Sequence, residues 1–327
     1  MKTTALSRAV LALSLTLFAA VPQSPANDLL AAAFAGDVIA RYDGATGALV
    51  GTFATSPAPG VMDGPTAMVY GADGNLYVLN EFSKNVLRFD GTTGAFIDEF
   101  ISAATFTTAG VPDPGDMELG PDGNLYISSH FPGGGPLFTA VWKFSGTTAN
   151  DFLGPFASFG TVHHTHGLTF GPGGKLYLGD IDAGGPQQFD ATSGAYLGAL
   201  PLVPPFSVLF GDLTFTPGGT GDGNTGVIKD DGVTTTALIA PGGGESYWGI
   251  LADGGYLYVG NKDTGTIKKF TDTGVFVSDF ITGFYAPHAF DLIPMATPEP
   301  GSGLLLSAGL GLPRVAAQAE VDALNAA

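Results

Sequence analysis

The sequence contains no cysteine among its 327 residues. Disulfide bonds therefore contribute nothing to stability, which must come from a hydrophobic core and from closure of the fold. Charged residues are also scarce, at 13%, whereas glycine accounts for 50 residues and proline for 23. This composition argues against a helical bundle or a disordered chain, and it is typical of many short strands joined by tight turns.

Basic residues are few, with 12 Lys and Arg against 30 Asp and Glu, and the formal net charge is −18. Such an acidic chain should repel nucleic acids and anionic membranes, so we expect neither as a partner. Two common catalytic motifs are missing as well. The glycines stand in hairpins rather than before helices, so no phosphate-binding loop is formed, and no Gly-x-Ser-x-Gly sequence occurs.

Residues 1–26 are expected to be a secretory signal peptide. Lys2 and Arg8 supply a basic region, Val10–Ala20 supplies an apolar core, and Ser24–Ala26 offers small residues before the cut. The alternative is an uncleaved membrane anchor, for which the apolar run is short. We therefore expect an exported protein that is periplasmic, at the cell surface or extracellular.

Residues 296–327 carry a second candidate targeting segment. Thr297-Pro298-Glu299-Pro300 is followed by the apolar run Gly301–Leu312 and then by Pro313-Arg314. This pattern resembles the PEP-CTERM sorting signal of bacterial exported proteins, which implies contact with a sorting machinery. The apolar run is shorter than the ~20 residues that cross a bilayer, and Val315–Ala327 is acidic where the family has arginines. The resemblance is thus to a degenerate signal, and a proline-rich linker and tail is the alternative.

One stretch, Pro65–Phe100, reads as four short strands in a meander. The second strand is apolar on both faces, which predicts a sheet stacked between two others. Tight turns separate the strands, and Asp73-Gly74 tolerates the positive φ angles that a hairpin demands. The predicted strands are Ala67–Tyr70, Leu76–Leu79, Asn85–Asp90 and Ala95–Phe100.

Degraded copies of this stretch fill most of the sequence and predict the fold. The first copy lacks an opening strand, and the C-terminal Pro287–Leu292 supplies a spare one. In the weakest copy, Asp212–Pro241, Gly226-Val227-Ile228 stands in for the second strand. We therefore predict a six-bladed β-propeller over residues 27–295, closed by pairing of the N- and C-terminal strands. A parallel β-helix would need shorter repeats. The second strand recurs around Tyr77, Tyr126, Tyr177 and Tyr258, and the third around Arg41, Arg88, Lys143, Gln188 and Lys269.

The repeats resemble those of NHL-type propellers over about residues 27–295. They lack the Trp-Asp signature of WD40 proteins, because Trp142 and Trp248 are followed by Lys and Gly. Some NHL-like propellers are zinc-dependent lyases with three channel histidines, and Asp63-Gly64-Pro65 faintly resembles the opening Glu-Gly-Pro of calcium-dependent lactonases. The resemblance therefore implies zinc or calcium as a candidate cofactor.

The first strand of each blade lines the central channel, so equivalent residues face one another there. Alignment of the repeats places His166 and His288 at one level in opposite blades, and Asp116 and Asp212 at the next level. Two imidazoles and two carboxylates are suited to a divalent metal or a polar ligand. Polar side chains lining a water-filled channel are the alternative. Trp248 at the first level, and His163 and His164 in the adjoining loop, are further candidates for ligand binding.

Two hypotheses about function remain open. The favoured one is a monomeric, non-catalytic binding or scaffold protein of the bacterial envelope or extracellular matrix, which uses the loops of one propeller face to hold a polymer, a protein or a small ligand. The rival is a metal-dependent lyase or hydrolase built on His166, His288, Asp116 and Asp212.

Overall fold

The computed structural model describes residues 27–34, 38–129, 138–159, 165–171, 173–180, 187–199, 207–209, 214–216, 227–230, 235–239, 247–261, 263–283 and 287–293. The predicted signal peptide and the C-terminal segment lie outside these residues. Among the described residues, no helix has the length and apolar character needed to span a membrane.

The strands form six four-stranded sheets. The first contains β24 (Pro287–Leu292), β1 (Leu29–Ala33), β2 (Val38–Tyr42) and β3 (Leu49–Thr55). The second contains β4 (Pro65–Tyr70), β5 (Leu76–Asn80), β6 (Asn85–Phe89) and β7 (Phe96–Ile101). The third contains β8 (Pro114–Leu119), β9 (Leu125–Ser129), β10 (Phe138–Phe144) and β11 (Phe152–Phe159). The fourth contains β12 (Thr165–Gly171), β13 (Lys175–Asp180), β14 (Gln187–Asp190) and β15 (Tyr196–Ala199). The fifth contains β16 (Ser207–Leu209), β17 (Thr214–Thr216), β18 (Val227–Asp230) and β19 (Thr235–Ile239), and the sixth contains β20 (Tyr247–Asp253), β21 (Tyr256–Asn261), β22 (Thr266–Thr271) and β23 (Phe276–Thr282).

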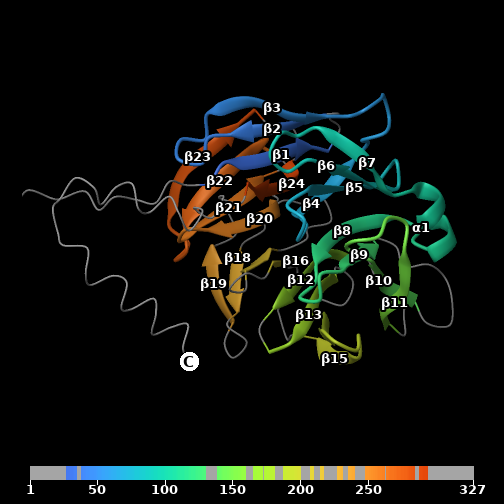
Figure 1. The fold of residues 1–327 in the computed structure, drawn as a ribbon. Helices are drawn as coiled ribbons and strands as arrows, with labels where there is room; N and C mark the ends of the chain where they lie inside the picture. The colour runs from blue at the N-terminus through green and yellow to red at the C-terminus, as the bar shows by residue number, and fades with distance from the viewer. Residues whose placement is uncertain are drawn as a thin grey trace, which may run out of the picture.

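Each sheet is antiparallel, five of them are meanders and the first combines β24 with β1–β3, and the sheets are arranged around a common centre (Figure 1). The innermost strands are β24, β4, β8, β12, β16 and β20, and the outermost are β3, β7, β11, β15, β19 and β23. Neighbouring inner strands contact each other, β24 with β4, β4 with β8, β8 with β12, β12 with β16, and β20 with β24. The fold is a β-propeller, as the repeats predict.

The two ends of the described chain meet in the first sheet, where β1 lies beside β24 (Figure 1). The pairing is antiparallel, with Leu29 opposite Leu292. Beyond the strands, the backbone N–H of Ile293 donates to the carbonyl oxygen of Asp28 at 2.9 Å. The Asp28 carboxylate also accepts from Arg41 Nε at 2.6 Å and from the N–H of Gly44 at 3.1 Å. The predicted strand Pro287–Leu292 and its pairing with the N-terminal strand β1 are therefore confirmed.

The second strands lie inside their sheets, and β5 and β9 are buried on both faces as predicted. Every residue of β5 and β9 is buried. The tyrosine of each strand keeps its hydroxyl satisfied at the edge of the core, because Tyr77 donates to Asp73 Oδ2 at 3.0 Å and Tyr126 to Asp122 Oδ2 at 3.1 Å. Burying a tyrosine ring while its hydroxyl finds a carboxylate combines a large apolar gain with no unpaired polar atom.

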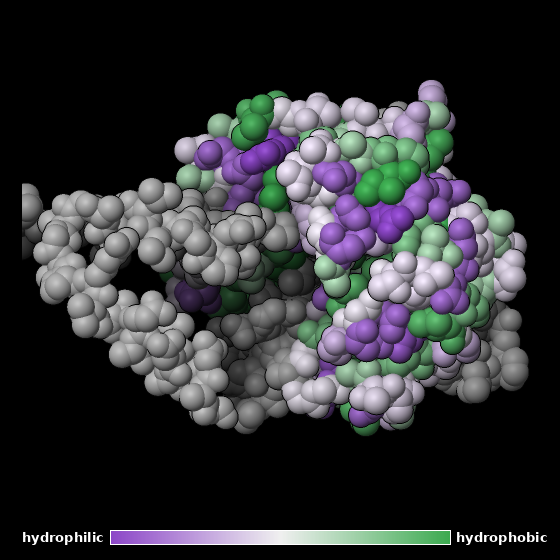
Figure 2. Space-filling view, in the orientation of Figure 1, coloured by the Kyte–Doolittle hydropathy of each residue, from purple (hydrophilic) through white to green (hydrophobic). Residues whose placement is uncertain are grey.

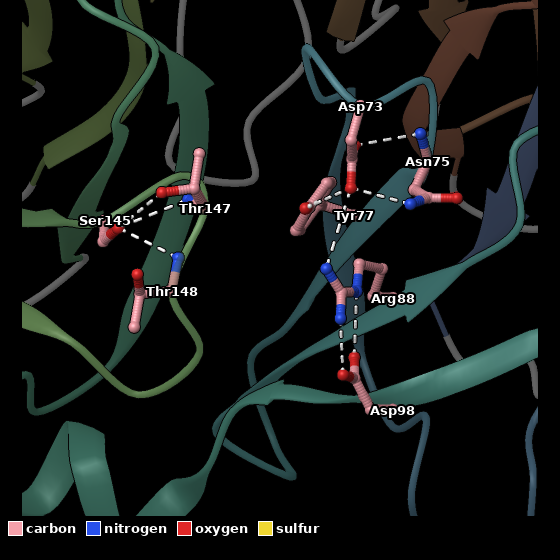
Figure 3. A network of polar contacts seen from close by, with 8 residues as sticks. All are labelled: Asp73, Asn75, Tyr77, Arg88, Asp98, Ser145, Thr147 and Thr148. Atoms are coloured by element: carbon pink, nitrogen blue, oxygen red, sulfur yellow. Dashed lines mark hydrogen bonds and ion pairs between the residues drawn. The ribbon is translucent and has the colours of Figure 1, made fainter.

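Cations of the third strands tie these hairpin turns to the sheet, and Figure 3 shows Arg88, whose Nη1 lies 3.6 Å from Asp73 Oδ2. Arg88 forms a two-bond pair with Asp98, with Nε at 3.1 Å and Nη2 at 2.6 Å from the carboxylate oxygens. Its guanidinium lies 5.0 Å from the centroid of the Phe100 ring. In the next sheet Lys143 takes the same place, with its ammonium 2.6 Å from Asp122. The recurring cation is thus a structural feature of the blades.

A glycine in the turn before the outer strands β3, β7, β15 and β23 lies against the preceding sheet, whereas before β11 Asn150 takes this place at φ +57° and its N–H donates to Phe100 O at 2.9 Å. Gly94 has φ +72°, and a Cβ atom on it would lie 1.8 Å from the carbonyl oxygen of Phe53 in the preceding sheet. Its backbone therefore approaches that carbonyl so closely that only a hydrogen fits. The equivalent pairs are Gly47 with Phe280 at 2.0 Å, Gly194 with Phe156 at 1.9 Å, and Gly274 with Leu238 at 1.9 Å. The Gly47 pair joins the first sheet to the sixth across the closure.

The outer strands expose apolar side chains at their beginnings, among them Leu49, Val50 and Phe96. On the face in Figure 2, hydrophobic residues lie in small groups between hydrophilic ones. The pairing register of β7 shifts near the beginning of this strand, between Arg88 and Phe89 of the neighbouring β6. Such bulges bend an edge strand and discourage pairing with another chain.

Two features of the fold differ from expectation. The assignment of Gly226-Val227-Ile228 to a second strand is wrong, because β18 is the third strand of its sheet and β17 is the second. The alignment relied on an apolar run, which β18 satisfies and the short β17 does not. The structure also contains a helix that the repeats do not predict, α1 (Ala103–Ala109), capped by Ser102 and ended by Gly110 at φ +76°.

Candidate functional site

Five of the six inner strands share an irregularity near their beginnings, and β16 pairs with β17 without one. The register shifts between Pro65 and Ala67 in β4 and between Pro114 and Met117 in β8. Matching shifts occur in β12, β20 and β24. Bulges re-aim the side chains beside them. The residues at or beside these bulges are Thr66, Gly115, Asp116, His166, Gly167, Trp248, Gly249 and His288, which include most of the predicted channel residues.

The structure places several predicted site residues on inner strands without describing their side chains. His166 belongs to β12, Trp248 to β20 and His288 to β24. Asp212, His163 and His164 lie outside the described residues, and β16 ends at Leu209, before Asp212. The metal site and the ligand-binding role of these residues therefore remain predictions. Within the described part of the chain, no group of three or more metal-binding side chains is brought together.

Asp116 is the one predicted site residue whose side chain is described. Its Oδ2 accepts the backbone N–H of Leu168 in the next sheet at 2.6 Å, and its Oδ1 accepts the N–H of Met117 at 2.8 Å. Burial raises its pKa to about 6, although both N–H bonds act in the opposite direction. Asp116 therefore joins the third and fourth sheets beside the channel.

Two further carboxyl groups beside the channel were not predicted from the sequence. Glu118 lies two residues after Asp116 and within electrostatic range of its carboxylate. Asp291 occupies the matching position of β24, because Glu118 pairs with Tyr126 and Asp291 with Leu30 in the two second strands. Burial raises the pKa of Glu118 to about 8, and the neighbouring carboxylates of Asp116 and Asp291 add to the effect. Extending the aligned channel positions further along the strands would have found this pair.

A second group of polar and aromatic residues lies where β4 and β8 begin, and we call it the β4–β8 mouth. It consists of Asp63 and Gly64 before β4, Glu81, Phe82 and Lys84 after β5, and Asp113 before β8. The two loops beside the β4–β5 hairpin are joined, because the N–H of Glu81 donates to Gly64 O at 2.8 Å and that of Phe82 to Asp63 O at 3.2 Å.

Phe82 is exposed at this mouth and is nevertheless held in place. Its side chain is 57% exposed. One side of the ring packs on Gly64, where φ is +66° and a Cβ atom would lie 2.8 Å from a ring carbon. The ring of Phe34 from the first sheet meets it edge-on, with the centroids 5.0 Å apart and the planes at 62°. An aromatic ring is therefore presented to solvent in a defined position.

Lys84 joins the other side of the mouth to the segment before the third sheet, and Glu81 lies within electrostatic range of Asp113 there. Burial and, to a lesser extent, the nearby Asp113 carboxylate raise the pKa of Glu81 to about 7, while Lys84 acts in the opposite direction. Lys84 adopts φ +51°, an uncommon value for a residue with a side chain. Its ammonium donates to the carbonyl oxygen of Pro112 at 2.6 Å.

Two buried polar atoms lie directly behind the mouth. Asn80 precedes Glu81 and pairs with Pro65, while Thr66 occupies the bulge of β4. Asn80 Nδ2 donates to Val78 O at 3.1 Å and to Asn85 Oδ1 at 3.0 Å. Asn80 Oδ1 and Thr66 Oγ1 are buried and have no hydrogen-bond partner among the described residues. Buried polar atoms are usually paired, so these two are candidates for contact with a ligand or water.

No protein-family model and no curated protein sequence matches this chain. Solved structures do match. The chain is similar to the structure of a nidogen/laminin complex, with a TM-score of 0.59, 14% identity, and coverage of 81% of this chain and 97% of the other. A putative 6-phosphogluconolactonase from Bacteroides fragilis matches with a TM-score of 0.52 and 15% identity, over 83% and 99%. A protein of unknown function from Bacteroides caccae matches with a TM-score of 0.53 and 13% identity, over 81% and 98%. At these identities the likeness shows the propeller fold alone.

Proposed function

We propose that this protein is an exported, non-catalytic binding protein that acts as a scaffold in the bacterial envelope or extracellular matrix and holds its partner at the β4–β8 mouth. The observation that carries the proposal is Phe82, whose ring is exposed but fixed between Gly64 and Phe34. Holding an apolar ring in water contributes little to folding, whereas exposed aromatic residues frequently anchor binding partners.

Export and sorting rest on the two chain ends. Residues 1–26 have the layout of a signal peptide, and the segment after Thr297 resembles a degenerate PEP-CTERM signal. The repeats support membership of the NHL-type propellers. Among the similar solved structures, one is a complex of nidogen and laminin and another is a putative lactonase, so the fold by itself favours neither binding nor catalysis.

The rival function is a metal-dependent lyase or hydrolase that uses His166, His288, Asp116 and Asp212. Asp116 already accepts two backbone N–H groups. Metal coordination there would have to share the same carboxylate oxygens with those bonds. The two functions therefore differ in which residues matter, those of the mouth or those of the bulges.

The test measures retention of the purified full chain on the envelope and matrix fraction of the producing organism. We expect Phe82→Ala to lose retention with an unchanged melting temperature. The matched control is Phe276→Ala, which removes a ring 51% exposed on the outer strand β23. A His166→Ala, His288→Ala double variant should still be retained. Unchanged retention of Phe82→Ala would refute a binding role for the mouth, and stoichiometric metal that is lost from the double variant together with activity would establish the enzyme instead.

A further inference from the structure

The third-strand cation of the sixth sheet is Lys269, and its ammonium has no hydrogen bond or ion pair among the described residues. Every other lysine whose side chain is described has a polar partner for its ammonium. These pairs are Lys84 with Pro112 O, Lys143 with Asp122, Lys175 with Gln188 and Lys268 with Asp279. Within the described part of the chain, Lys269 is therefore the lysine whose N–H groups no protein acceptor occupies.

The outer strand opposite Lys269 carries no carboxylate at the paired position. Lys269 pairs with Ser278 of β23. In the second sheet the equivalent cation, Arg88, pairs with Asp98 of β7 and binds its carboxylate through two hydrogen bonds. A serine in place of the aspartate removes the charge that would neutralise the cation.

The hairpin before β21 is also too short to supply a carboxylate. Two glycines with φ values of +55° and +80° form a two-residue turn between Asp253 and Tyr256. Asp253 is thereby held in the strand ladder, and it acts on Lys269 through its charge without an ion pair between these two described residues. In the third sheet the turn is longer, and Asp122 within it lies 2.6 Å from the Lys143 ammonium.

Aromatic rings surround the Lys269 ammonium instead. Its nitrogen lies 4.0 Å from the centroid of the Tyr256 ring, 5.1 Å from that of Tyr258 and 5.0 Å from that of Phe280. Tyr258 and Phe280 are buried, so this side of the amine is removed from water. Rings attract an ammonium, but Lys143 also lies over two rings. The feature that distinguishes Lys269 is therefore the missing carboxylate.

The two lysines differ in which protonation state their surroundings favour. Burial lowers the pKa of Lys269, although the Asp253 carboxylate acts in the opposite direction. The hydrogen bond to Asp122 raises the pKa of Lys143. At a given pH, a larger fraction of Lys269 is thus the neutral amine, which is the nucleophilic form. Desolvation of this kind activates the lysines that form Schiff bases in proteins.

From this arrangement we propose that Lys269 is a covalent attachment site for an aldehyde that carries an apolar group. After the ammonium releases a proton to water, Nζ attacks the carbonyl carbon, and loss of one water leaves a C=N bond to the ligand. Amine and aldehyde give imine and water, so the step needs no oxidant or reductant. Tyr256 lies nearest the nitrogen and is partly exposed, so its ring can pack against the apolar group. The site does not depend on the binding function proposed for the β4–β8 mouth.

The test treats the purified full chain at neutral pH with propanal and sodium cyanoborohydride, which reduces the imine to a stable amine. Peptide mass spectrometry gives the labelling rate of each lysine. We expect Lys269 to react about twofold to fivefold faster than Lys143, the factor that corresponds to the ordinary strength of a surface ion pair. Glycolaldehyde has a hydroxyl in place of the terminal methyl of propanal, and it should show a smaller preference for Lys269.

Two variants change the carboxylates beside the two lysines. Ser278→Asp places an acid opposite Lys269, as in the second sheet, and should slow its labelling to about the rate of Lys143. Asp122→Asn removes the anionic partner of Lys143 and should speed its labelling while leaving Lys269 unchanged. Because the two changes lie in different sheets, misfolding of one variant leaves the other to decide, and melting temperatures show which variants are folded.

Three results would overturn the proposal. Equal labelling rates of Lys269 and Lys143 in the unaltered chain would show that the missing carboxylate has no effect. An unchanged rate at Lys269 in folded Ser278→Asp would show the same. An equal preference for Lys269 with glycolaldehyde and with propanal would rule out selection of an apolar aldehyde. Phe82→Ala changes the mouth alone and should be labelled like the unaltered chain, so failure at Lys269 and failure of the proposed binding function are distinguishable.

Discussion

Replacing Gly94 by alanine tests whether the turn glycines hold neighbouring sheets together. The new Cβ atom would lie 1.8 Å from Phe53 O, where non-bonded carbon atoms do not approach within 3.0 Å. Either the turn or the outer strand β3 must move by more than an ångström. Gly94 also has φ +72°, which costs a residue with a side chain about 1 kcal/mol. Together with the clash, we expect a loss of roughly 3–5 kcal/mol in the free energy of unfolding.

Gly74 provides the matched control, because its φ is +75° and a Cβ atom on it would meet nothing within 4 Å. Gly74→Ala therefore carries the backbone cost without the clash, and we expect it to lose about 1 kcal/mol. Urea denaturation followed by circular dichroism gives both values. At about 2–4 °C per kcal/mol, the two variants should differ in melting temperature by several degrees. Equal losses for Gly94→Ala and Gly74→Ala would refute the role of the contact.

Three more predictions concern charged side chains. The raised pKa of Glu81 means that the folded state keeps a proton that the unfolded chain releases near its ordinary pKa of 4.5, so stability should fall between pH 4.5 and about 7. Glu81→Gln should remove roughly 1–2 kcal/mol of that fall, allowing for partial exposure, and pH-dependent melting curves that match the wild type would contradict it. Asp28→Ala should cost about 1–2 kcal/mol by removing its bonds to Arg41 and Gly44, with amide exchange increasing in β1 and β24 but not in β5; a uniform increase would argue against a local closure contact. Asp116→Ala should cost about 1–3 kcal/mol in urea, because the buried N–H of Leu168 loses its acceptor, whereas Asp116→Asn keeps one acceptor oxygen and should lose less.

Most of the fold could be predicted from the sequence, because each sheet repeats the same physical requirements. A second strand buried on both faces needs an uninterrupted apolar run, and Tyr77 and Tyr126 mark that run in the second and third sheets. The fifth sheet has no such marker, and its second strand, β17, is three residues long. The alignment of the repeats therefore matched the second strands with the apolar run at Val227, which belongs to the third strand. Prediction failed where the repeat had lost the residues that the burial of the strand requires.

Helix α1 could have been predicted only from its ends. Ser102 and Gly110 are good cap residues. The segment between them is seven residues long and contains three threonines, which favour strands over helices. Local propensity thus argued against the helix, and it forms because Phe106 is buried in the core between the second and third sheets.

The residues of the candidate site likewise fall into those that the sequence predicts and those that it does not. Aligned repeats bring equivalent residues together, so Asp116 could be assigned to the inner strand in advance, and Glu118 and Asp291 follow from the same alignment. The β4–β8 mouth lies in loops, where the repeats no longer align. No property of Phe82 in the sequence shows that its ring is exposed. That conclusion needs the close approach of Gly64 and the edge contact with Phe34, which join two sheets.

A comparison of the residues that recur in several sheets with those that do not indicates where a binding site should be sought. Residues that recur in several sheets, such as the tyrosines of the second strands and the turn glycines, are accounted for by burial and by close contact between sheets. Phe82 is not accounted for in this way, because most of its ring is in water and it fills no core. Gly64 nevertheless leaves room for that ring, and the Phe34 ring contacts it edge-on. An exposed ring that is held in place without filling the core is suited to contact with a partner, and it directs the search for a partner to this mouth.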